Sequence, residues 1–377
     1  MKGGIIICKK ATKEISQKEL WYWLCNLPGI GQKKLTRLLE VFSEPMDIFY
    51  SREQDLRGIG GLKEKDYCTI LQNRSIDNIR KHLHNLERKH ISFCSYADSC
   101  YPQKLRDIYD PPYGLYSLGT LPDSYKLSLG IIGARNCSPY GREVARYFAR
   151  SLAQAGVQII SGMARGIDSY GHEGALEASG YTLAVLGSGI DYCYPEENIE
   201  LYRKLENQGG ILSEYGPGVL PKAGHFPLRN RIISGLCDGI LVIEAKGKSG
   251  SLITADQGLE QGKDIFSIPG RICDALSEGT NQLIKYGAQL ITSPQEILEY
   301  YNITNYREPL SNGSKDKLVL SEEEKKVLCC LGLESKHISS LIEQSSMDMG
   351  SLMKVLLHLE MKKLVAQTSK NYYIRVL

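Results

Sequence analysis

The sequence lacks the short motifs that mark several large enzyme classes. It contains no Walker loop with a phosphate-binding lysine, no His-Glu-x-x-His pair for a catalytic zinc ion and no Gly-x-Ser-x-Gly turn for a serine nucleophile. Its seven histidines are scattered, with no evident pairing to a nucleophile. We therefore predict a protein that catalyses no reaction and uses no cofactor.

Signals for metals and membranes are also missing. None of the eleven cysteines forms a Cys-x-x-Cys pair or stands at a zinc-like spacing from a histidine, so we predict reduced structural thiols and no metal site. The first ten residues carry one short apolar run, Ile5 to Ile7, between lysines. Such a run is too short for a signal-peptide core or a membrane span, which predicts a cytoplasmic protein with no membrane partner.

The composition is that of an ordinary soluble protein with more than one domain. Hydrophobic residues make up 42% and charged residues 24% of the 377 positions, and 37 glycines are the informative excess. The net charge is only +3. A polyanion would therefore have to be bound by local clusters of cations and by oriented backbone amides, because no global field attracts it.

Residues 1–89 are expected to form a small helical N-terminal domain. Two glycine-containing turns, Leu27 to Gly31 and Arg57 to Gly61, each precede a helical stretch. A helix N-terminus after such a turn offers free amides to a phosphate, in the manner of a helix-hairpin-helix motif that holds DNA backbones. The same pattern also fits two ordinary helical connections, and the sequence leaves both interpretations open.

Residues 90–302 alternate apolar runs with helical stretches. From the third run onward each apolar run is followed by a plausible helix, which predicts an α/β domain: a Rossmann-like, doubly wound and mostly parallel sheet. The expected strands are 91–94, 114–118, 127–132, 157–160, 182–186, 210–213, 239–243, 264–268 and 289–291.

The last part of the chain reads as a linker and a small domain. Residues 303–318 are polar and rich in helix breakers, as a linker should be. Residues 319–377 hold three helical stretches followed by a short hairpin, the outline of a winged-helix-like domain. A generic helical cap is the alternative that this pattern leaves open.

The loops after three successive strands share one pattern: glycines, often with arginine, before a helix. In a doubly wound sheet ligands bind at the carboxyl ends of the strands, where glycine lets the backbone approach a phosphate and arginine adds a bidentate fork. We therefore predict phosphate binding by Gly133, Ala134, Arg135, Ser161, Gly162, Arg165, Gly166, Gly187, Ser188 and Gly189. Asp168 and Asp191 at these turns are expected to cap a helix or brace an arginine rather than to catalyse.

A further cluster lies between Gly224 and Ser234. Phe226 is placed where an unpaired base could stack on it, and a buried core position is its alternative. Arg229 and Arg231 point about 200° apart on a helix, so one is expected to face a ligand and the other the core or a partner strand. Lys248 extends the expected phosphate track, while the serines beside it could simply cap the next helix.

These segments together resemble the DNA-processing protein A (DprA, or Smf) family over about residues 90–300. The resemblance rests on motifs in order: Ser161-Gly-Met-Ala-Arg-Gly-Ile-Asp168, Gly189-Ile-Asp-Tyr-Cys-Tyr-Pro195, Phe226-Pro-Leu-Arg-Asn-Arg231, Ser249-Gly-Ser-Leu-Ile-Thr-Ala255 and Gly279-Thr-Asn281. One departure is Ala134, where the family often has a hydroxyl residue.

The resemblance implies a protein that binds single-stranded DNA, forms a homodimer and helps load the RecA recombinase in natural transformation or recombination. It places DNA contacts on Gly133, Arg135, Ser161, Gly162, Gly187 and Phe226. The alternative is a nucleotide-hydrolysing enzyme of the phosphoribohydrolase type on a related core. That family's Pro-Gly-Gly-x-Gly-Thr loop is not matched here, because Pro269-Gly270 is followed by Arg271.

Overall fold

The computed structural model describes residues 15–303 and 320–376. Two compact units are distinguished, the first holding the N-terminal helices with residues up to Tyr101 and Pro112–Tyr116, the second the rest of the chain. All but one residue of the predicted linker 303–318 lies outside the described residues, so the linker and the domain boundaries stay predictions.

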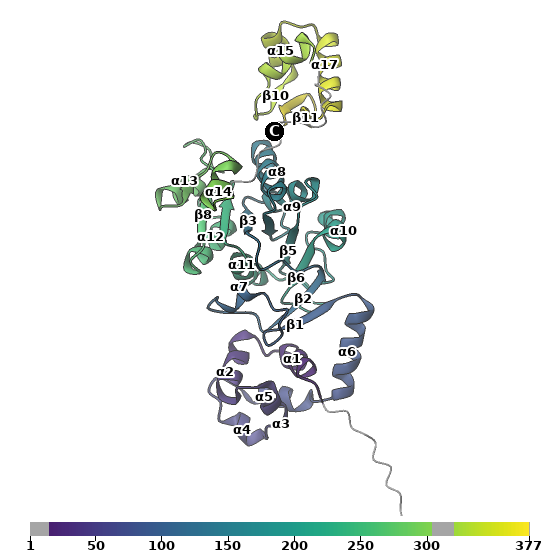
Figure 1. Cartoon of the computed structure of the whole chain (residues 1–377), viewed down its shortest axis with the longest axis vertical. Coiled ribbons are helices and arrows are strands. Elements are labelled where there is room, and N and C mark those ends of the chain that lie inside the picture. The colour runs from purple at the N-terminus through teal and green to yellow at the C-terminus, as the bar shows by residue number, and fades with distance from the viewer. Residues whose placement is uncertain (1–14, 304–319, 377) are drawn as a thin grey trace, which may run out of the picture. The chain divides into compact units, whose positions relative to one another are not determined.

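The first unit is helical and is drawn in purple and blue in Figure 1. A capping box of Ser16 and Glu19 starts its first helix, and Trp23 packs edge-on against Phe49 with ring centroids 4.9 Å apart. The helices are α1 (Gln17–Cys25), α2 (Gln32–Phe42), α3 (Pro45–Tyr50), α4 (Glu53–Arg57), α5 (Glu64–Gln72) and α6 (Ile76–Arg88), and the strand β1 (Ser92–Ser95) follows.

The second of the two predicted phosphate-binding turns, Arg57 to Gly61, leads to a helix N-terminus that is already occupied by a carboxylate. The carboxylate of Asp66 accepts a hydrogen bond from the backbone amide of Lys63 (2.8 Å) at the start of α5. It also pairs with Lys34 of α2 at 2.6 Å. A carboxylate therefore occupies the helix N-terminus that a phosphate would need, which favours the ordinary helical connection for the second turn.

The central domain is built on a parallel sheet with strand order β6-β5-β4-β3-β7-β8-β9. β3 pairs with β4 at Leu129 and Ile159, and with β7 at Ile131 and Leu241. These strands are β3 (Ser128–Ile132), β4 (Gln158–Ser161), β5 (Thr182–Leu186), β6 (Gly210–Ser213), β7 (Gly239–Val242), β8 (Asp264–Ser267) and β9 (Gln289–Leu290), and β2 (Gly114–Gly119) precedes them in the chain.

Helices connect these strands and cover the sheet (Figure 1). They are α7 (Gln103–Arg106), α8 (Pro139–Gln154), α9 (Ile167–Glu177), the 3₁₀ helix η1 (Glu196–Asn198), α10 (Ile199–Gln208), α11 (His225–Leu236), α12 (Gly250–Glu260), α13 (Glu278–Lys285) and α14 (Pro294–Tyr300). The Rossmann-like, doubly wound sheet predicted from the sequence is thus confirmed, with strand ends within one or two residues of the expected ones.

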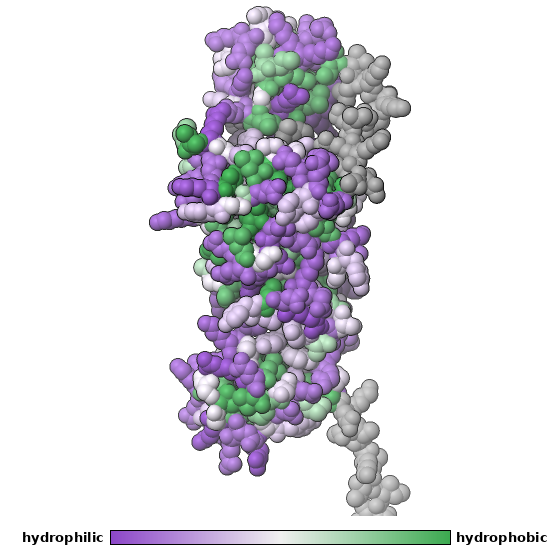
Figure 2. Space-filling view, turned by 60° about the vertical axis from the view of Figure 1, so that its left-hand side comes forward, coloured by the Kyte–Doolittle hydropathy of each residue, from purple (hydrophilic) through white to green (hydrophobic). Residues whose placement is uncertain are grey.

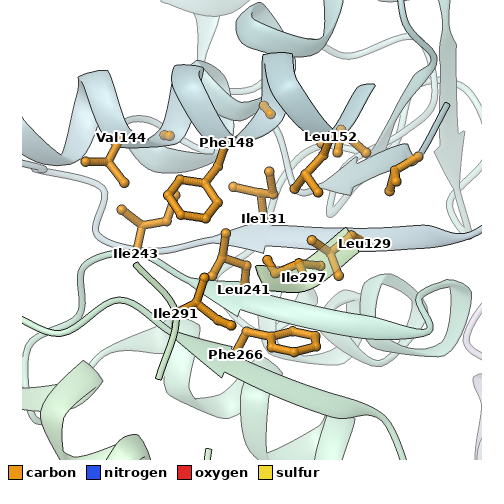
Figure 3. Close-up of a cluster of buried hydrophobic side chains, with 14 of the residues drawn as sticks. Leu129, Ile131, Val144, Phe148, Leu152, Leu241, Ile243, Phe266, Ile291 and Ile297 are labelled. Atoms are coloured by element: carbon orange, nitrogen blue, oxygen red, sulfur yellow. The ribbon is translucent and has the colours of Figure 1, made fainter. Parts of the chain in front are cut away.

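The core of this domain follows from the two periodicities of strand and helix. Val144, Phe148 and Leu152 recur every four residues on α8 and form one apolar stripe. Alternate residues of β3 and β7 point toward this stripe, and Figure 3 shows these side chains meeting between helix and sheet. On the opposite face of the sheet, Gly258 of α12 lies close to Ile240 and Ile265. Helices therefore pack on both faces.

The C-terminal domain has the winged-helix form that the hairpin pattern predicted. Its sheet is antiparallel in the order β10-β12-β11, and the short β10 was not anticipated. Leu341, Leu352, Leu356 and Leu359 lie in its core. The elements are α15 (Glu322–Cys330), β10 (Lys336–His337), α16 (Ile338–Ser345), α17 (Met349–Met361), β11 (Val365–Ser369) and β12 (Tyr372–Arg375).

The surface of the described chain is mixed in character. Figure 2 shows hydrophilic residues over much of the visible face, with hydrophobic residues gathered in small groups between them. Among the described helices none combines the length and the apolar character needed to cross a bilayer.

Candidate functional site

A cavity of the central domain lies at the point where the winding of the sheet reverses. From β3 the chain proceeds through β4, β5 and β6 toward one edge, whereas β7, β8 and β9 lead to the other. The loops after β3 and β7 diverge there, which leaves a crevice at the carboxyl ends of the two strands. The crevice has a volume of about 670 Å³. Three segments supply most of its lining: residues Ile132 to Asn136, then Phe226, Pro227, Arg229, Asn230 and Ile233, then Lys246, Lys248 to Ser251, Ile253 and Thr254.

The crevice is lined by cations. Arg135, Lys246 and Lys248 are exposed at its rim, and Arg229 lies buried beneath them. Asp168 is the one carboxylate among the lining residues, and it accepts hydrogen bonds from the backbone amides of Gly162 (3.1 Å) and Ala164 (3.4 Å). The excess of positive charge at a concave surface favours an anionic ligand.

Aromatic rings stand beside these cations. The guanidinium of Arg135 lies 5.7 Å from the ring centroid of Phe226, and the ring of Tyr194 lies 5.3 Å from that of Phe226 at an interplanar angle of 38°. Phe226 is half-buried, and Tyr194 is 42% exposed. Phe226 is therefore not fully buried, and it lines the crevice. A flat apolar face next to a cation is the combination on which a nucleobase can stack while its phosphate is neutralised.

Arg229 forms the floor of the crevice. Its Nη1 donates hydrogen bonds to the carbonyl oxygens of Gly162 (2.8 Å), which follows β4, and of Val185, which lies near the end of β5. Burial lowers the pKa of Arg229 to about 10, against the opposing effect of the nearby Asp168 carboxylate. The side chain is still charged at neutral pH, so it both holds two strand ends together and adds positive potential to the crevice.

The N-terminus of α12 forms one wall. The hydroxyl of Ser249 accepts a hydrogen bond from the backbone amide of Ser251 and so caps this helix, as the simpler of the two interpretations predicted. Lys246 and Lys248 precede the cap and are exposed. A helix N-terminus with two lysines beside it is an electrostatically favourable place for a phosphate.

The crevice brings together only part of the predicted set. Gly133, Ala134, Arg135, Phe226, Arg229 and Lys248 line it. The amide of Ala134 is not available to a ligand, because it donates to the carbonyl oxygen of Glu244 at 2.7 Å. The other predicted residues, Ser161, Gly162, Arg165, Gly166, Gly187, Ser188, Gly189 and Arg231, do not line the crevice.

The second loop, after β4, is turned inward. The hydroxyl of Ser161 donates to the carbonyl oxygen of Ile131 at 2.6 Å. A β-carbon on Gly162 would lie 2.7 Å from the guanidinium of Arg229, and one on Gly166 would lie 2.3 Å from the carbonyl oxygen of Ala134. These glycines are therefore needed for close packing of the protein on itself, and their predicted role in phosphate binding stays a prediction.

The third loop, after β5, is closed in the same way. The hydroxyl of Ser188 donates to the carbonyl oxygen of Tyr192 at 2.9 Å, and the amide of Gly189 donates to that of Val219 at 2.7 Å. A β-carbon on Gly187 would meet the ring of Phe226 at 2.8 Å. Gly187 therefore affects the crevice indirectly: because it has no side chain, the ring of Phe226 can pack directly against the backbone of the third loop.

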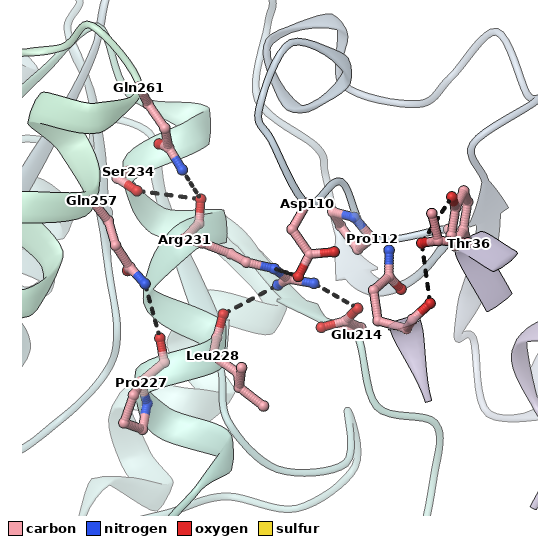
Figure 4. A network of polar contacts seen from close by, with 12 residues as sticks. Thr36, Asp110, Pro112, Glu214, Pro227, Leu228, Arg231, Ser234, Gln257 and Gln261 are labelled. Atoms are coloured by element: carbon pink, nitrogen blue, oxygen red, sulfur yellow. Dashed lines mark hydrogen bonds and ion pairs between the residues drawn. The ribbon is translucent and has the colours of Figure 1, made fainter. Parts of the chain in front are cut away.

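Two of the predicted arginines are paired with carboxylates. Arg231 is 9% exposed and contacts Glu214 (2.8 Å) and Asp110 (3.3 Å), as the dashed lines in Figure 4 show. Arg231 is thus held by two carboxylates, whereas Arg229 lines the crevice, and the expectation that one of the two faces a ligand stays a prediction. Arg165 is exposed and pairs with Glu197 at 2.7 Å.

Sequence reasoning missed several lining residues. Asn136 and Asn230 line the crevice beside predicted residues, and Tyr194 comes from the far end of the third loop. The signal for Tyr194 was present, because an aromatic residue stood within a segment already quoted for its motif. Its position opposite Phe226 depends on how that loop folds, which spacing in the sequence does not determine.

Comparison with known proteins agrees with this architecture. The family model of DNA recombination-mediator protein A matches residues 92–302, and that of the DprA winged helix domain matches residues 314–369. DNA processing protein DprA of Streptococcus pneumoniae is 45% identical over 273 residues, which are 72% of this chain and 93% of that protein. Protein Smf of Synechocystis is 31% identical over 398 residues, with 96% and 100% covered.

Two solved structures extend the comparison to the fold. DprA from Streptococcus pneumoniae superposes with a TM-score of 0.65 at 35% identity and covers 76% of this chain and 98% of its own. DNA processing protein A from Helicobacter pylori superposes with a TM-score of 0.51 at 32% identity, covering 56% and 97%. With a family model matching more than half of its length and relatives matching along most of it, the chain belongs to the DNA recombination-mediator protein A (DprA/Smf) family.

Proposed function

We propose that the crevice between the loops after β3 and β7 binds single-stranded DNA without reading its sequence. The observation that carries this proposal is the placement of Arg135 over the ring of Phe226, 5.7 Å from its centroid, in a cavity that Arg229, Lys246 and Lys248 also line. A single-stranded DNA binding mode is described for the related protein of Helicobacter pylori, which supports the same ligand class here.

The geometry favours a single strand over a duplex. The Phe226 ring needs an open base face, and in a duplex each base face is covered by its stacked neighbours. The cations at the rim contact phosphates, which carry no sequence information. We therefore infer a strand held by its backbone and by at least one stacked base, with affinity that falls as salt rises.

We also propose that the crevice binds DNA without cleaving it. Asp168 is the one carboxylate that lines the crevice, and it accepts hydrogen bonds from the backbone amides of Gly162 and Ala164 in the loop after β4. The carboxylate of Glu244 accepts the amide of Ser138 at 2.8 Å and so caps the start of α8. Both groups serve the local structure, which supports binding rather than hydrolysis.

A direct titration tests the proposed function. Fluorescence anisotropy with labelled oligonucleotides of mixed sequence should show tighter binding to a single strand than to the matched duplex, at both low and moderate salt. Single strands of unrelated sequence should bind alike, since phosphate and stacking contacts are sequence-tolerant. Equal or tighter binding of the duplex would contradict the proposal.

Family membership supports two further proposals about partners. We propose that the protein forms a homodimer, which presents two DNA sites and tightens apparent binding through effective concentration. We also propose that it helps to load the RecA recombinase on single-stranded DNA in natural transformation or recombination. Light scattering that finds only monomer at micromolar concentration would contradict the first. A RecA-filament assay unchanged by added protein would contradict the second.

A further inference from the structure

The turn after β1 holds two cysteine sulfurs in contact. Cys94 is the third residue of β1, Cys100 follows six residues later, and their Sγ atoms are 2.8 Å apart. A disulfide bond is about 2.0 Å long, so this separation exceeds it by roughly 0.8 Å. Cys94 is 4% exposed, whereas Cys100 is exposed. One sulfur of the pair is therefore open to reagents and the other lies directly behind it.

The backbone between the two cysteines is already fixed in the shape that the contact needs. The Asp98 amide donates to the carbonyl oxygen of Ser95 at 3.0 Å. The Asp98 carboxylate accepts hydrogen bonds from the Ser95 amide (2.7 Å) and hydroxyl (2.8 Å). The amide of Tyr101 then donates to the carbonyl oxygen of Asp98 at 3.2 Å. Because these bonds hold the turn closed, joining the sulfurs requires only a small movement of two side chains.

Asp98 also lies near both sulfurs: one ligand atom from each of Cys94, Asp98 and Cys100 falls within 4.8 Å of the others. Such a set has the donors of a site for a soft divalent cation. The sulfur separation favours a different chemistry, however. Two thiolates bound to one zinc ion at about 2.3 Å each in tetrahedral geometry stand well over 3 Å apart, farther than these sulfurs.

We propose that Cys94 and Cys100 form a reversible intramolecular disulfide by exchange with a low-molecular-weight disulfide such as oxidised glutathione. The exposed Cys100 thiolate attacks one sulfur of glutathione disulfide, forms a mixed disulfide and releases one glutathione thiolate. The Cys94 thiolate then attacks Cys100 Sγ and releases the second glutathione. The two protein thiols lose two electrons, glutathione disulfide gains them, and the two thiol protons pass to the released thiolates.

The roles of the two cysteines follow from their exposure. Exchange proceeds through a mixed disulfide and depends on access to the attacking sulfur, which only Cys100 provides in this pair. The buried Cys94 is then the resolving thiol. Its sulfur is already in contact with the atom that it must attack, so the intramolecular step outcompetes a second collision with glutathione.

The test is thiol mapping of the full chain. After incubation with oxidised glutathione, alkylation of the remaining thiols and proteolysis, we expect a peptide pair linked through Cys94 and Cys100 and a loss of both from the alkylated pool. Dithiothreitol should restore both. Cys273, an exposed cysteine elsewhere in the chain, serves as the control: Cys273→Ser should leave the link unchanged, and Cys100→Ser should abolish it.

Two outcomes would overturn the proposal. In the first, Cys100 stops at the glutathione adduct while Cys94 is still alkylated after unfolding, which would make Cys100 an ordinary exposed thiol. In the second, one zinc ion per chain protects both thiols from alkylation while no glutathione ratio produces the link, which would make the turn a metal site. Because Cys100 is exposed, Cys100→Ser is expected to fold, and its circular dichroism spectrum checks this.

Discussion

Two loops of the central domain have similar sequence patterns but differ in how much of each loop is packed against the protein. The first, Gly133–Asn136 after β3, carries an exposed Arg135 above the crevice. The second, Ser161–Asp168 after β4, uses the hydroxyl of Ser161 and the amides of Gly162 and Ala164 for hydrogen bonds within the protein. The same sequence pattern, glycine and arginine before a helix, therefore occurs both in a loop that borders the crevice and in a loop that packs against the protein.

The order of the strands explains the difference. β3 lies where the winding reverses, so the loops after β3 and β7 lead away from each other and open a crevice. β4 lies between β3 and β5, and the Arg229 guanidinium donates hydrogen bonds to Gly162, just after β4, and to Val185, near the end of β5. The location of a strand in the sheet thus decides whether its glycine loop borders the crevice or packs against a side chain.

The largest expected effect tests whether the second loop is packed. Gly166 has φ of +75°, and a β-carbon there would lie 2.3 Å from the carbonyl oxygen of Ala134. Gly166→Ala should lower the free energy of unfolding by about 1–3 kcal/mol from the backbone conformation alone, and the contact should add to this. Thermal unfolding measures it.

Gly218 supplies the matched control for this substitution. Its φ is +80°, and a β-carbon there would meet nothing within 4 Å, so Gly218→Ala isolates the conformational cost. If Gly166→Ala proved as stable as Gly218→Ala but bound single-stranded DNA more weakly, the glycine would serve a ligand. That result would contradict our interpretation that the second loop is packed against the protein while the first loop borders the crevice.

The next effect concerns Phe226, which covers the third loop and faces the first. Phe226→Ala should cost about 1–3 kcal/mol of single-strand affinity if a base stacks on the ring. An oligonucleotide with abasic sites should lose a similar amount with the unaltered protein. The two losses should not add, because both remove the same contact.

Melting temperature measured on the same variant separates stacking from packing. A core phenylalanine would cost roughly 3–5 kcal/mol of stability on truncation, whereas the half-buried Phe226 should cost less. A stable Phe226→Ala protein with unchanged affinity would refute the stacking role and leave a purely phosphate-binding track.

The fold was predictable because its signals are local and repeated. Each buried strand of the parallel sheet is a short apolar run, and the stripe of Val144, Phe148 and Leu152 marks α8 by its spacing. The hairpin of β11 and β12 likewise identified the winged helix. The two-residue β10 escaped notice, since a strand so short has no periodicity of its own.

The site was predictable only in part, because it depends on distant residues. The crevice joins Arg135 to Phe226 and Lys248, which the motifs had marked. That Arg231 is held by Glu214 and Asp110 is not visible in the sequence, since these carboxylates lie 17 and 121 positions away from it. A sequence motif therefore identifies candidate functional residues, but it does not show whether their side chains line the crevice or contact other residues of the protein.

The smallest effect compares the two loop arginines directly. Arg135→Ala should weaken binding to all single-stranded sequences alike and reduce the salt dependence of log K by about one unit, because it removes a phosphate contact. Arg165→Ala is the matched control: its side chain is 57% exposed and pairs with Glu197 across the surface, a pair worth about 0–1 kcal/mol. Neither variant should shift the melting temperature appreciably, and Arg165→Ala should leave affinity unchanged. Equal losses of affinity in both would mean that the strand crosses both loops, whereas a loss of folding in Arg135→Ala would make that arginine structural.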